Sequence, residues 1–575
     1  YEAIDSHSTI SFSIMDTLIM RKTLLYEDLL EVLCKQLEKE NGSMEALKRI
    51  RISLNKRAYK YNWTIDQIYT ELAKRLKLSE EQVDKIKTKE LELEQALCIP
   101  RKKMLDIFQY AKDKKKRIFL IEDTYLPKDF LCQILEKAGV NGYEEILLSC
   151  EQRRKKEDSL FDLLQSTVGQ EKILHVGCNQ MLDGERAQSK GFDVYQISSA
   201  LDMLNVSLYK DMQIKAGSIN ERSMMGLWVS RMFNNPFSLY RTGGRAVVNR
   251  LEDMAYLYVA PLISTFILWL VRTVKENSWD DLLFAARDGF LLQRLYHKAL
   301  EKFKLTDIPK GIYFYTSRRV CAGAAIKEER DIKWLADIPC YYSMEELIRD
   351  RFEIKERDII PFNRVRYESA FEYAMAHREK IYDQSKQTRL NYFKYMNYKG
   401  LKIGGNYAFI DFCSIGTCQW FLDNIVPFQL TGLYFCKYFN ETNMVNNVKV
   451  KSLFQNLSPY ACDSYFYEHY LFLETVMTSQ EPSLFSIDGE GKPVFAKEER
   501  TEDQKEAVEN MQAEIERYFN EYLEMYIDTE PLDPEYSDML YSFMGEGYAK
   551  IESRELKELI LEDGLGRGPI KVAQQ

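Results

Sequence analysis

The stretch Ile10-Ser11-Phe12-Ser13-Ile14-Met15-Asp16-Thr17 decides the fold of the first part of the chain. It joins a short apolar run to a small polar segment that contains one acid. Similar runs follow at residues 117–121, 145–148 and 172–176, with amphipathic segments such as 129–138 between them. Alternation of short apolar strands with helices is typical of α/β domains, so we expect a parallel, Rossmann-like sheet.

A long helical insertion separates the first two of these strands. Residues 26–100 are rich in charge, and their apolar side chains recur at helical spacing, as at Leu29 and Leu33. This periodicity predicts amphipathic helices rather than strands. We therefore expect a helical cap at about residues 25–100, inserted into a first domain that spans residues 1–205.

Residues 206–575 are predicted to form a second α/β domain. Strand-like apolar runs occur at residues 281–285, 311–315, 407–410 and 430–435, and polar or small residues follow them. Several of these polar residues would lie at the carboxyl ends of parallel strands, which is where open α/β sheets bind their ligands.

Helical patterns mark two other parts of this domain. Segments 498–526 and 534–561 predict a helical C-terminal extension. Met254–Val271 is an uncharged run of 18 residues that contains Pro261. It is barely long enough to span a bilayer, so a buried core helix is favoured, while peripheral contact with a membrane assembly stays open.

The charge balance and the cysteine content of the chain limit the classes of function to be considered. The 575 residues include 79 Lys and Arg against 88 Asp and Glu, a formal net charge of −9. A general nucleic-acid binder needs a surplus of basic residues, so nucleic acid is not an expected partner. The 11 cysteines are odd in number and include no Cys-x-x-Cys pair, which suits a reducing cytoplasm better than a disulfide framework.

Ser13, Asp16 and Thr17 resemble the first motif of the haloacid dehalogenase (HAD) phosphatases. In that motif an aspartate nucleophile is followed by a second aspartate and a threonine. The nucleophile attacks phosphorus and forms an acyl phosphate, which a hydroxyl cannot reproduce without an activating base. The resemblance implies that Ser13 stands at a lost nucleophile position and that Asp16 keeps only the acid/base role.

The remaining HAD motifs are matched in order, with departures. Asp123 lies in a segment similar to the second motif, where Ser or Thr normally stands at the position of Glu122. Lys155 matches the lysine of the third motif. Asp183 follows a segment similar to the fourth motif, in which Cys178 replaces an aspartate.

These departures all affect phosphoryl transfer. In the family, Mg²⁺ is held by carboxylates at the positions of Ser13 and Cys178 and by a backbone carbonyl at Asp16, so the resemblance leaves only a weak site here, with Asp16 and Asp183 as ligands. Glu122 adds negative charge where the phosphoryl group binds. No histidine stands at a motif position beside Ser13. We expect hydrolase activity to be lost, with candidate residues for binding a phosphate at Thr17, Glu122, Asp123 and Lys155.

Two basic clusters in the second domain follow predicted strands. Arg287 and Asp288 come after the run at residues 281–285 and precede a helix, and Arg318 and Arg319 follow the next run. Paired guanidinium groups suit bidentate contacts with phosphate or diphosphate. A surface salt bridge for the arginines and a helix N-cap for Asp288 are the structural alternatives.

A third cluster follows the run at residues 407–410. Asp411 ends the run, and Gly416 and Thr417 begin the next helix after a turn of small residues. Backbone N–H groups at such a helix start can bind an anion, with the Thr417 hydroxyl as a further donor. An ordinary strand-to-helix turn explains the same pattern.

Together the three clusters resemble the second domain of large two-domain HAD-type proteins encoded with bacterial capsule and O-antigen enzymes. The family elements are Ala-Arg-Asp-Gly followed by an aromatic residue, Ser-Arg-Arg, and Asp-x-Gly-x-x-Gly-Thr, from which Cys413 departs. Glu474 and the segment 479–483 lie in a block that resembles a later part of these proteins. The resemblance covers nearly the whole chain.

This resemblance implies a cytoplasmic bacterial protein of surface-glycan biosynthesis. Its second domain would transfer a phosphoribosyl or other glycosyl group from a diphosphate donor to a glycan acceptor. Arg287, Arg318 and Arg319 would bind the diphosphate, Asp288 or Asp411 would orient sugar hydroxyls or Mg²⁺, and Gly416 and Thr417 would hold a phosphate. Mg²⁺ is therefore expected in the second domain rather than the first.

Two alternatives stay open. One is a HAD-type sugar-phosphate phosphatase, and the other is a non-catalytic scaffold that binds phosphorylated sugars. Peripheral association with membrane glycan-assembly enzymes is compatible with the leading hypothesis and with the scaffold.

Overall fold

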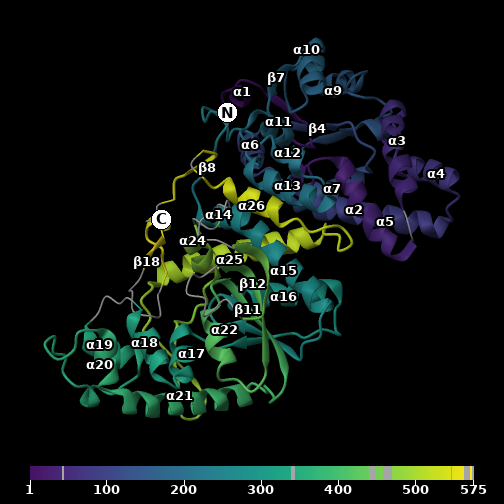
Figure 1. The fold of residues 1–575 in the computed structure, drawn as a ribbon. Coiled ribbons are helices and arrows are strands. Elements are labelled where there is room, and N and C mark those ends of the chain that lie inside the picture. Colours follow the sequence, from purple (N-terminus) through teal and green to yellow (C-terminus); the bar gives the residue numbers. More distant parts are fainter. Residues whose placement is uncertain are drawn as a thin grey trace. The chain divides into compact units, whose positions relative to one another are not determined.

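The computed structural model divides the chain into two compact units (Figure 1). It describes residues 1–41, 44–338, 343–438, 448–456, 466, 469–545, 547–553, 555–561 and 570–572. Unit 1 comprises Tyr1–Val247, Glu524–Leu532 and Gly545–Ile551, and unit 2 comprises Val248–Leu523, Asp533–Met544 and Glu552–Gln575.

The boundary between the two units lies after Val247, later in the chain than the boundary at residue 205 predicted from the sequence. That position falls in helix α11 (Ala200–Val206), which contacts α13 (Ile219–Met232) within unit 1. Helix α13 buries most of its residues, including Trp228, and also contacts the cap helix α2. Because α13 is buried on nearly all sides, it lacks one apolar and one polar face, and this weak periodicity hides its membership of unit 1 in the sequence.

The sheet of unit 1 is parallel, and its strand order is β5-β4-β1-β6-β7. From β1 the chain moves outward in one direction to β4 and β5, and then in the other direction to β6 and β7. The order therefore reverses between β1 and β6, and ligands of open α/β sheets bind beside such a reversal. The strands are β1 (Thr9–Phe12), β4 (Arg117–Glu122), β5 (Glu145–Leu148), β6 (Ile173–Gly177) and β7 (Asp193–Gln196).

Helices cover both faces of this sheet, and their apolar faces form two clusters. One contains Ile10, Phe12 and Phe108, and the other contains Phe119 and Phe161. The α/β architecture predicted from the sequence is confirmed, and it places the loops after β1 and β6 side by side. The helices outside the cap, besides α11 and α13, are α1 (Glu2–Asp5), α6 (Lys102–Asp113), α7 (Lys128–Lys137), α8 (Ser149–Gln152), α9 (Leu160–Val168), η1 (Gln180–Arg186), α10 (Ala187–Ser189) and α12 (Met212–Lys215).

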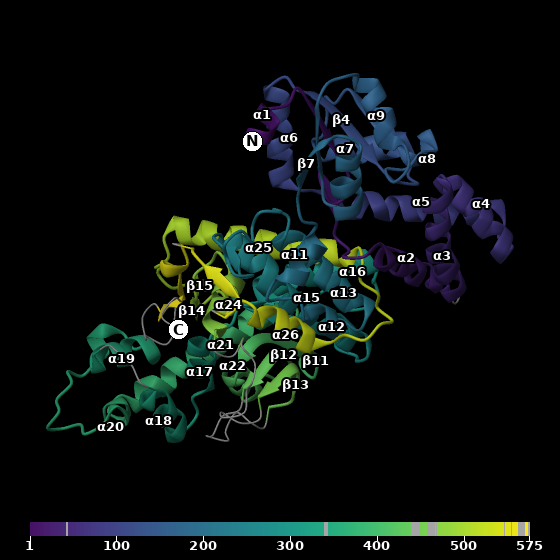
Figure 2. The same cartoon turned by 90° about the horizontal axis from the view of Figure 1, so that it is seen from above.

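The cap enters and leaves the sheet domain through a short antiparallel pair, β2 (Ile19–Arg21) and β3 (Cys98–Pro100). Capping boxes at Thr64 and Ser79 begin its last two helices. Helices α3 and α4 are neighbours in Figures 1 and 2 and pack against each other. The four cap helices are α2 (Tyr26–Asn41), α3 (Glu45–Tyr61), α4 (Ile65–Leu76) and α5 (Glu80–Leu97).

A buried ion pair joins the cap helices. The Arg51 guanidinium donates to both carboxylate oxygens of Glu90, at 3.0 and 2.6 Å, and Tyr26 and Tyr69 donate to the same carboxylate at 2.9 and 2.6 Å. Arg51 also lies 5.1 Å from the ring centre of Tyr125, in the loop that follows β4. This network links α2, α3, α4 and α5 to the sheet domain beside the site described below.

Unit 2 contains a second parallel sheet of five strands, in the order β10-β9-β11-β12-β13. The order reverses between β9 and β11, so the loops after these strands flank the expected ligand position. The sequence predicted the first four strands and missed the last. The strands are β9 (Asp281–Ala285), β10 (Ile312–Phe314), β11 (Asn406–Ser414), β12 (Gln429–Tyr438) and β13 (Val450–Asn456).

The apolar segment around Met254–Val271 is a core helix of unit 2. Within the described residues, Leu251–Lys275 is the one helix long and apolar enough to cross a membrane, and 94% of its most apolar window is buried. It comprises α14 (Leu251–Met254), η2 (Ala255–Val259) and α15 (Ala260–Lys275), and α15 contacts α16, α25 and α26. Burial against neighbouring helices accounts for its composition.

Further helices complete unit 2. Figures 1 and 2 show α18, α19 and α20 together, away from β11 and β12. The remaining elements are α16 (Gly289–Phe303), α17 (Arg318–Ala325), α18 (Glu329–Asp337), α19 (Met344–Arg351), η3 (Glu356–Asp358), α20 (Ala370–Met375), α21 (Arg378–Tyr398), α22 (Thr417–Asp423), α24 (Tyr470–Met477), β14 (Leu484–Ile487), β15 (Pro493–Phe495), α25 (Glu502–Leu523) and α26 (Pro534–Ser542).

The predicted helical end is only partly helical. Helix α25 agrees with the segment at 498–526, but α26 ends at Ser542 and not at residue 561. Gly545 and Gly547 follow soon after, and glycine disfavours continuation of a helix. The elements after α26 are β16 (Ala549–Ile551), η4 (Glu555–Lys557), β17 (Ile560–Leu561) and β18 (Ile570–Lys571), and β8 (Ala246–Val248) stands where unit 1 gives way to unit 2.

The cap network yields a stability prediction. Substitution Arg51→Ala leaves the buried Glu90 carboxylate without its cation, which typically costs about 3–5 kcal/mol. The matched control is Arg75→Ala, which removes a partly exposed pair with Glu71 (2.9 Å) and should cost less than about 1 kcal/mol. Urea unfolding followed by circular dichroism measures both, and equal losses would contradict the assignment.

Candidate functional site

The loop after β1 places Ser13 at the carboxyl end of the first sheet. The Ser13 amide donates to the Val176 carbonyl of β6 at 2.9 Å, which continues the strand pairing by one residue. Asp16 then adopts a left-handed backbone with φ of 55°. Such a conformation is uncommon for a residue other than glycine and turns the chain sharply away from the sheet.

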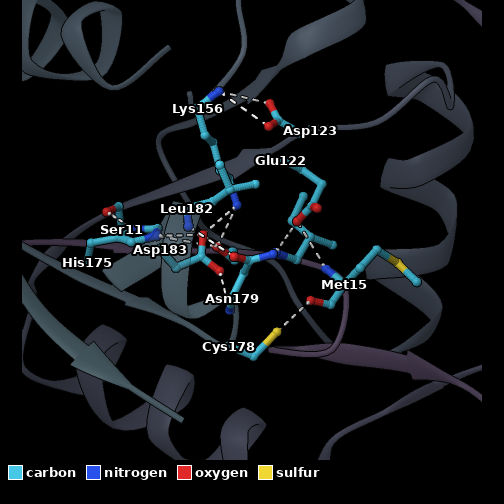
Figure 3. Close-up of polar contacts among 12 residues, drawn as sticks. Ser11, Met15, Glu122, Asp123, Lys156, His175, Cys178, Asn179, Leu182 and Asp183 are labelled. Atoms are coloured by element: carbon cyan, nitrogen blue, oxygen red, sulfur yellow. Dashed lines mark hydrogen bonds and ion pairs between the residues drawn. The ribbon is translucent and has the colours of Figure 1, made fainter. Parts of the chain in front are cut away.

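Ser13 belongs to a buried hydrogen-bonded network with Lys156 and Asp183 (Figure 3). The Ser13 hydroxyl donates to Asp183 Oδ1 at 2.8 Å, and Lys156 Nζ donates to both Ser13 Oγ and Asp183 Oδ1, each at 2.8 Å. Asp183 approaches closely because residue 177 is glycine, where a Cβ atom would lie 2.4 Å from the Asp183 carboxyl carbon. All three network side chains are at most 4% exposed.

His175 also lies beside Ser13, contrary to the expectation that no histidine does. Its Nε2 is 3.4 Å from Ser13 Oγ and 3.2 Å from Asp183 Oδ1, and its Nδ1 is 2.8 Å from Ser11 Oγ. The register of β1 against β6 pairs Ser11 with His175, which motif spacing alone does not reveal. Burial lowers the pKa of His175, so the ring is neutral near pH 7.

The hydrogen-bond pattern leaves Ser13 without a base. A carboxylate can only accept, so we assign the His175 proton to Nε2, facing Asp183, while Nδ1 accepts from Ser11. Burial alone would raise the pKa of Asp183, but Lys156 and the bond from His175 hold it well below its usual range. Burial alone would lower the pKa of Lys156, but three carboxylates, Asp183 first, hold it above its ordinary value. A protonated lysine and a weakly basic carboxylate do not activate a hydroxyl.

Glu122 binds the backbone of the same loop. Its Oε2 accepts from the Ile14 amide at 2.7 Å and from the Met15 amide at 3.1 Å. Burial raises the pKa of Glu122 to about 7, although Lys156 and the two amides favour the charged form. Glu122 therefore satisfies two backbone N–H donors of the loop.

The remaining predicted residues of unit 1 are distributed around this network. Asp123 accepts from the backbone amide of Lys156 at 3.0 Å and so holds the lysine segment in place. Thr17 is buried beside the Cys178 thiol. Lys155, the lysine expected from the sequence, instead pairs with Glu157 at 3.3 Å and lies over the Tyr59 ring of the cap. Its neighbour Lys156 is the lysine that enters the network.

These residues do not fit Mg²⁺. The Asp16 carbonyl, an expected ligand, accepts from the Arg101 guanidinium at 2.6 Å, and burial raises the pKa of the Asp16 carboxyl, opposed by Arg21 and Arg101. The Cys178 thiol faces the Met15 carbonyl at 3.9 Å, and burial raises its pKa to about 12, so it is neutral. Mg²⁺ prefers charged oxygen ligands, and among the described residues no cluster of acids, histidines and cysteines has the form of a metal site.

The second sheet brings together charged residues from three strand ends. Arg287 and Asp288 follow β9, Arg318 follows β10, and Asp411 lies in β11, so all four surround the reversal of strand order. Arg287 has a left-handed backbone with φ of 72°, and its amide donates to the Tyr313 hydroxyl at 2.9 Å. A strained residue held at such a position is a common mark of a functional site.

These groups are close enough to influence one another's charge. Burial raises the pKa of Asp288 to about 7, with Arg287 and Arg318 opposing the shift and Asp411 adding to it. Glu474 on α24 joins the same cluster, and burial together with Asp288 raises its pKa to about 8. Carboxyl groups that titrate near neutral pH are suited to proton transfer.

Further contacts define the borders of this charged cluster. The Arg287 guanidinium donates to the Ser483 hydroxyl at 2.9 Å. Lys437 at the end of β12 donates to the Ile415 carbonyl, and burial lowers its pKa to about 8, with Asp411 acting in the opposite direction. The cluster thus combines basic residues (Arg287, Arg318 and Lys437) with acidic residues (Asp288, Asp411 and Glu474).

Arg318 and Arg319 separate instead of acting as a pair. Arg318 is exposed and influences Asp288 and Glu474, whereas Arg319 is buried and stacks on the Phe485 ring at 3.7 Å, with Glu353 4.0 Å away. Consecutive residues at the start of α17 point in different directions, because side chains on a helix are about 100° apart. Arg319 therefore supports the packing of unit 2.

Gly416 and Thr417 form a turn rather than a complete anion site. Gly416 adopts φ of 90° and begins α22, a helix of only seven residues, and Thr417 is buried. The side chains of Cys413 and Ser414 lie outside the described residues. Asp288 occupies an N-cap position of α16 but makes no capping hydrogen bond through its side chain, so the N-cap alternative does not explain it.

Comparison with known proteins returns no matching family model and no curated relative. Solved structures with similar parts include the Bacillus subtilis protein YfnB, described as a HAD-hydrolase bound to magnesium (14% identity, 33% of this chain and 88% of that one, TM-score 0.26). Others are a Streptococcus pneumoniae hydrolase (18%, 35% and 97%, 0.22) and a predicted phosphoglycolate phosphatase of Haemophilus somnus (18%, 34% and 91%, 0.23). These HAD-family likenesses are too distant to bear on chemistry.

Sequence reasoning missed several residues of both sites. Lys156 and His175 stood next to or inside quoted motifs, and their buried positions follow only from the packing of β1, β4 and β6. Glu474 stood in a family-like block without an assigned role. Glu474 could have been found from its place in the apolar run Leu471–Met477, because an acidic side chain on a buried helix face requires a partner.

Glu122 gives unit 1 a pH-dependent stability. In the unfolded chain its pKa is near 4.5, and in the folded chain about 7, so folding takes up a proton between these pH values. Stability should therefore fall as pH rises from about 4.5 to about 7 and then level off, by at most about 3 kcal/mol from this group. Substitution Glu122→Gln should remove this part of the dependence, as urea midpoints at pH 5 and pH 8 would show. The exposed Glu136→Gln should leave the profile unchanged.

The network also predicts the absence of hydrolysis at Ser13. With Mg²⁺ and p-nitrophenyl phosphate, the unchanged chain and Ser13→Ala should release p-nitrophenol at the same background rate, because no base activates the hydroxyl. Release that depends on Mg²⁺ and is abolished by Ser13→Ala would show that Ser13 is a nucleophile after all.

Proposed function

We propose that this protein acts in bacterial surface-glycan biosynthesis, in the cytoplasm, and that its chemistry belongs to unit 2. Unit 2 would transfer a phosphoribosyl or other glycosyl group from a diphosphate donor to a glycan acceptor. One observation carries the proposal: Arg287, Arg318, Asp288, Asp411 and Glu474 gather where the strand order of the second sheet reverses. That position is the usual ligand site of an open α/β sheet.

The basic residues of the cluster are suited to binding the diphosphate of the glycosyl donor. Arg287 and Arg318 come from different strand ends, so their guanidinium groups can contact two phosphates of one diphosphate. Lys437 would add a third positive charge when protonated, below its pKa of about 8. These contacts would stabilise the negative charge that develops on the leaving diphosphate.

The acidic residues of the cluster are suited to activating the glycan acceptor. In the transfer, the bond between the anomeric carbon and the diphosphate oxygen breaks, and a bond from that carbon to an acceptor oxygen forms. The acceptor proton must pass to a base, and Asp288, with a pKa of about 7, is partly ionised at neutral pH. Glu474, with a pKa of about 8, would remain mostly protonated and could donate a hydrogen bond to a sugar hydroxyl.

Mg²⁺ suits unit 2 better than unit 1. Mg²⁺ is commonly held by one or two carboxylates together with substrate phosphates, and Asp411 would supply a carboxylate beside the proposed diphosphate position while Asp288 acts as the base. The ion would neutralise phosphate charge when bound. Unit 1 would then serve as a HAD-like module without hydrolase chemistry, and any association with membrane-bound assembly enzymes would use a surface other than the buried α15.

Binding of inorganic diphosphate tests this proposal without knowledge of the sugar, because the leaving group of every proposed donor contains a diphosphate unit. Calorimetric titration of the full chain with Mg²⁺ should show saturable binding that Arg318→Ala weakens by about tenfold or more. The neighbouring Arg319→Met, which keeps a long side chain against Phe485, is the matched control and should bind normally.

Donor identity follows from the same titration with phosphoribosyl pyrophosphate and with UDP-glucose. Tight binding of one donor would support the transferase if a glycan acceptor then releases its leaving group, inorganic diphosphate from phosphoribosyl pyrophosphate or UDP from UDP-glucose. Equal binding of diphosphate by the unchanged chain and Arg318→Ala, or no binding at all, would overturn the proposal and leave a scaffold role.

A further inference from the structure

One face of helix α21 in unit 2 carries basic and apolar side chains in alternation. Lys386, Leu390, Lys394 and Tyr398 follow one another at intervals of four residues, and all four are exposed. Residues four apart are neighbours on the surface of an α-helix, so these side chains form one continuous row about 18 Å long. Figure 1 shows α21 as a straight helix along one side of unit 2.

The row continues into the loop that follows the helix. The Leu401 amide donates to the Met396 carbonyl at 3.1 Å and holds this loop against the end of α21. Lys402 and Ile403 come next in the chain, and both are exposed. Ile403 is 87% exposed and Tyr398 is 85% exposed. The end of the row thus presents two large apolar side chains to solvent beside a lysine.

Core packing does not explain these apolar residues. The other side of α21 packs against α17 and β14, and it buries Ile381, Tyr392 and Met396. A helix that packs on one side normally carries polar residues on the side that faces solvent. Leu390, which is 56% exposed, and Tyr398 depart from this pattern on the outer side. An ordinary solvated helix face has no use for them.

The charge of this segment is opposite in sign to the charge of the whole chain. Residues 384–405 contain five Lys and Arg and no Asp or Glu, whereas the formal net charge of the chain is −9. Four of the five are lysines. The fifth, Arg389, donates to the backbone carbonyls of Ala324 and Ile326 and serves the packing of unit 2.

Acidic groups beside the row reduce this surplus without cancelling it. Asp383 lies 3.7 Å from Lys386. In the turn between β14 and β15, which Lys394 contacts, Asp488 and Glu490 are bonded within the turn itself. Positive charge therefore remains in excess along the row.

We propose that this face, the exposed row of α21 with the loop that follows it, binds the surface of an anionic lipid bilayer. Its lysines pair with lipid phosphates, while Leu390, Tyr398 and Ile403 enter the boundary between head groups and acyl chains. Lysines combined with large apolar side chains are typical of helices that lie on a membrane surface. Binding of nucleic acid depends on phosphate contacts and does not require exposed leucine or isoleucine. This inference is independent of the chemistry proposed for the charged cluster.

Flotation of the full chain with lipid vesicles tests the proposal. The chain should float with vesicles of equal parts phosphatidylglycerol and phosphatidylcholine, and much less with vesicles of phosphatidylcholine alone. Raising the salt concentration from about 0.05 M to about 0.5 M should weaken the binding, because salt screens the attraction between lysines and lipid phosphates.

Substitution of the apolar residues locates the contact. The double change Tyr398→Ser and Ile403→Ser should lower the partition coefficient by about tenfold or more, because it removes two side chains that leave water on binding. The matched control is Val365→Ser. Val365 is 96% exposed but lies between η3 and α20, so its substitution should leave binding unchanged. Circular dichroism checks that each variant is folded.

Substitution of the lysines measures the electrostatic part. The double change Lys386→Gln and Lys402→Gln should lower the partition coefficient at least about fivefold, since each basic residue near an anionic surface contributes about 1 kcal/mol. The control removes the same charge from two exposed lysines of unit 1, Lys102→Gln and Lys114→Gln. This control should bind the vesicles as the unchanged chain does.

Three outcomes would overturn the proposal: no binding to anionic vesicles, equal binding to vesicles of phosphatidylcholine alone, or equal effects of the variants and their controls. The first would leave the face to an acidic protein partner. Diphosphate binding through Arg318 has its own titration, so failure of the proposed transferase and failure of lipid binding are separate results.

Discussion

The buried ion pair between Lys156 and Asp183 governs the first unit. Lys156 Nζ and Asp183 Oδ1 are 2.8 Å apart, and both side chains are buried. Asp183 accepts a hydrogen bond from the Ser13 hydroxyl, and the pair keeps the lysine charged and assigns His175 its tautomer. A pair so enclosed stabilises only if its remaining hydrogen bonds are made, and here Ser13 and His175 make them. The same contacts that complete the pair remove the reactivity of the serine.

Much of the architecture could be read from the sequence. The apolar runs around Ile10, Ile118 and Leu283 identified strands because both faces of a parallel sheet are buried, and such strands are continuously apolar. Strand β13 was missed because its segment Val450–Asn456 lies at the edge of the sheet and is mostly polar, with no continuous apolar run. The continuation of unit 1 to Val247 was missed because α13 is buried on nearly all sides.

The sites were less predictable than the fold, for reasons of geometry. Lys155 and Lys156 are indistinguishable in sequence, and only the direction of the chain after β5 decides which one is buried. Arg318 and Arg319 look like a pair, yet helical geometry sends one to the charged cluster and the other to Phe485. Glu474 approaches Asp288 from nearly two hundred positions further along the chain, which no local pattern encodes.

The short β2–β3 pair has a consequence for how the protein could have been assembled. Arg21 and Cys98 are direct partners in this antiparallel pair, so the whole cap leaves and rejoins the sheet domain at one point. An insertion whose two ends are neighbours strains nothing when it is lengthened, shortened or exchanged. The cap is in this sense a cassette, and its helices could diverge in evolution without altering the register of β1, β4 and β6.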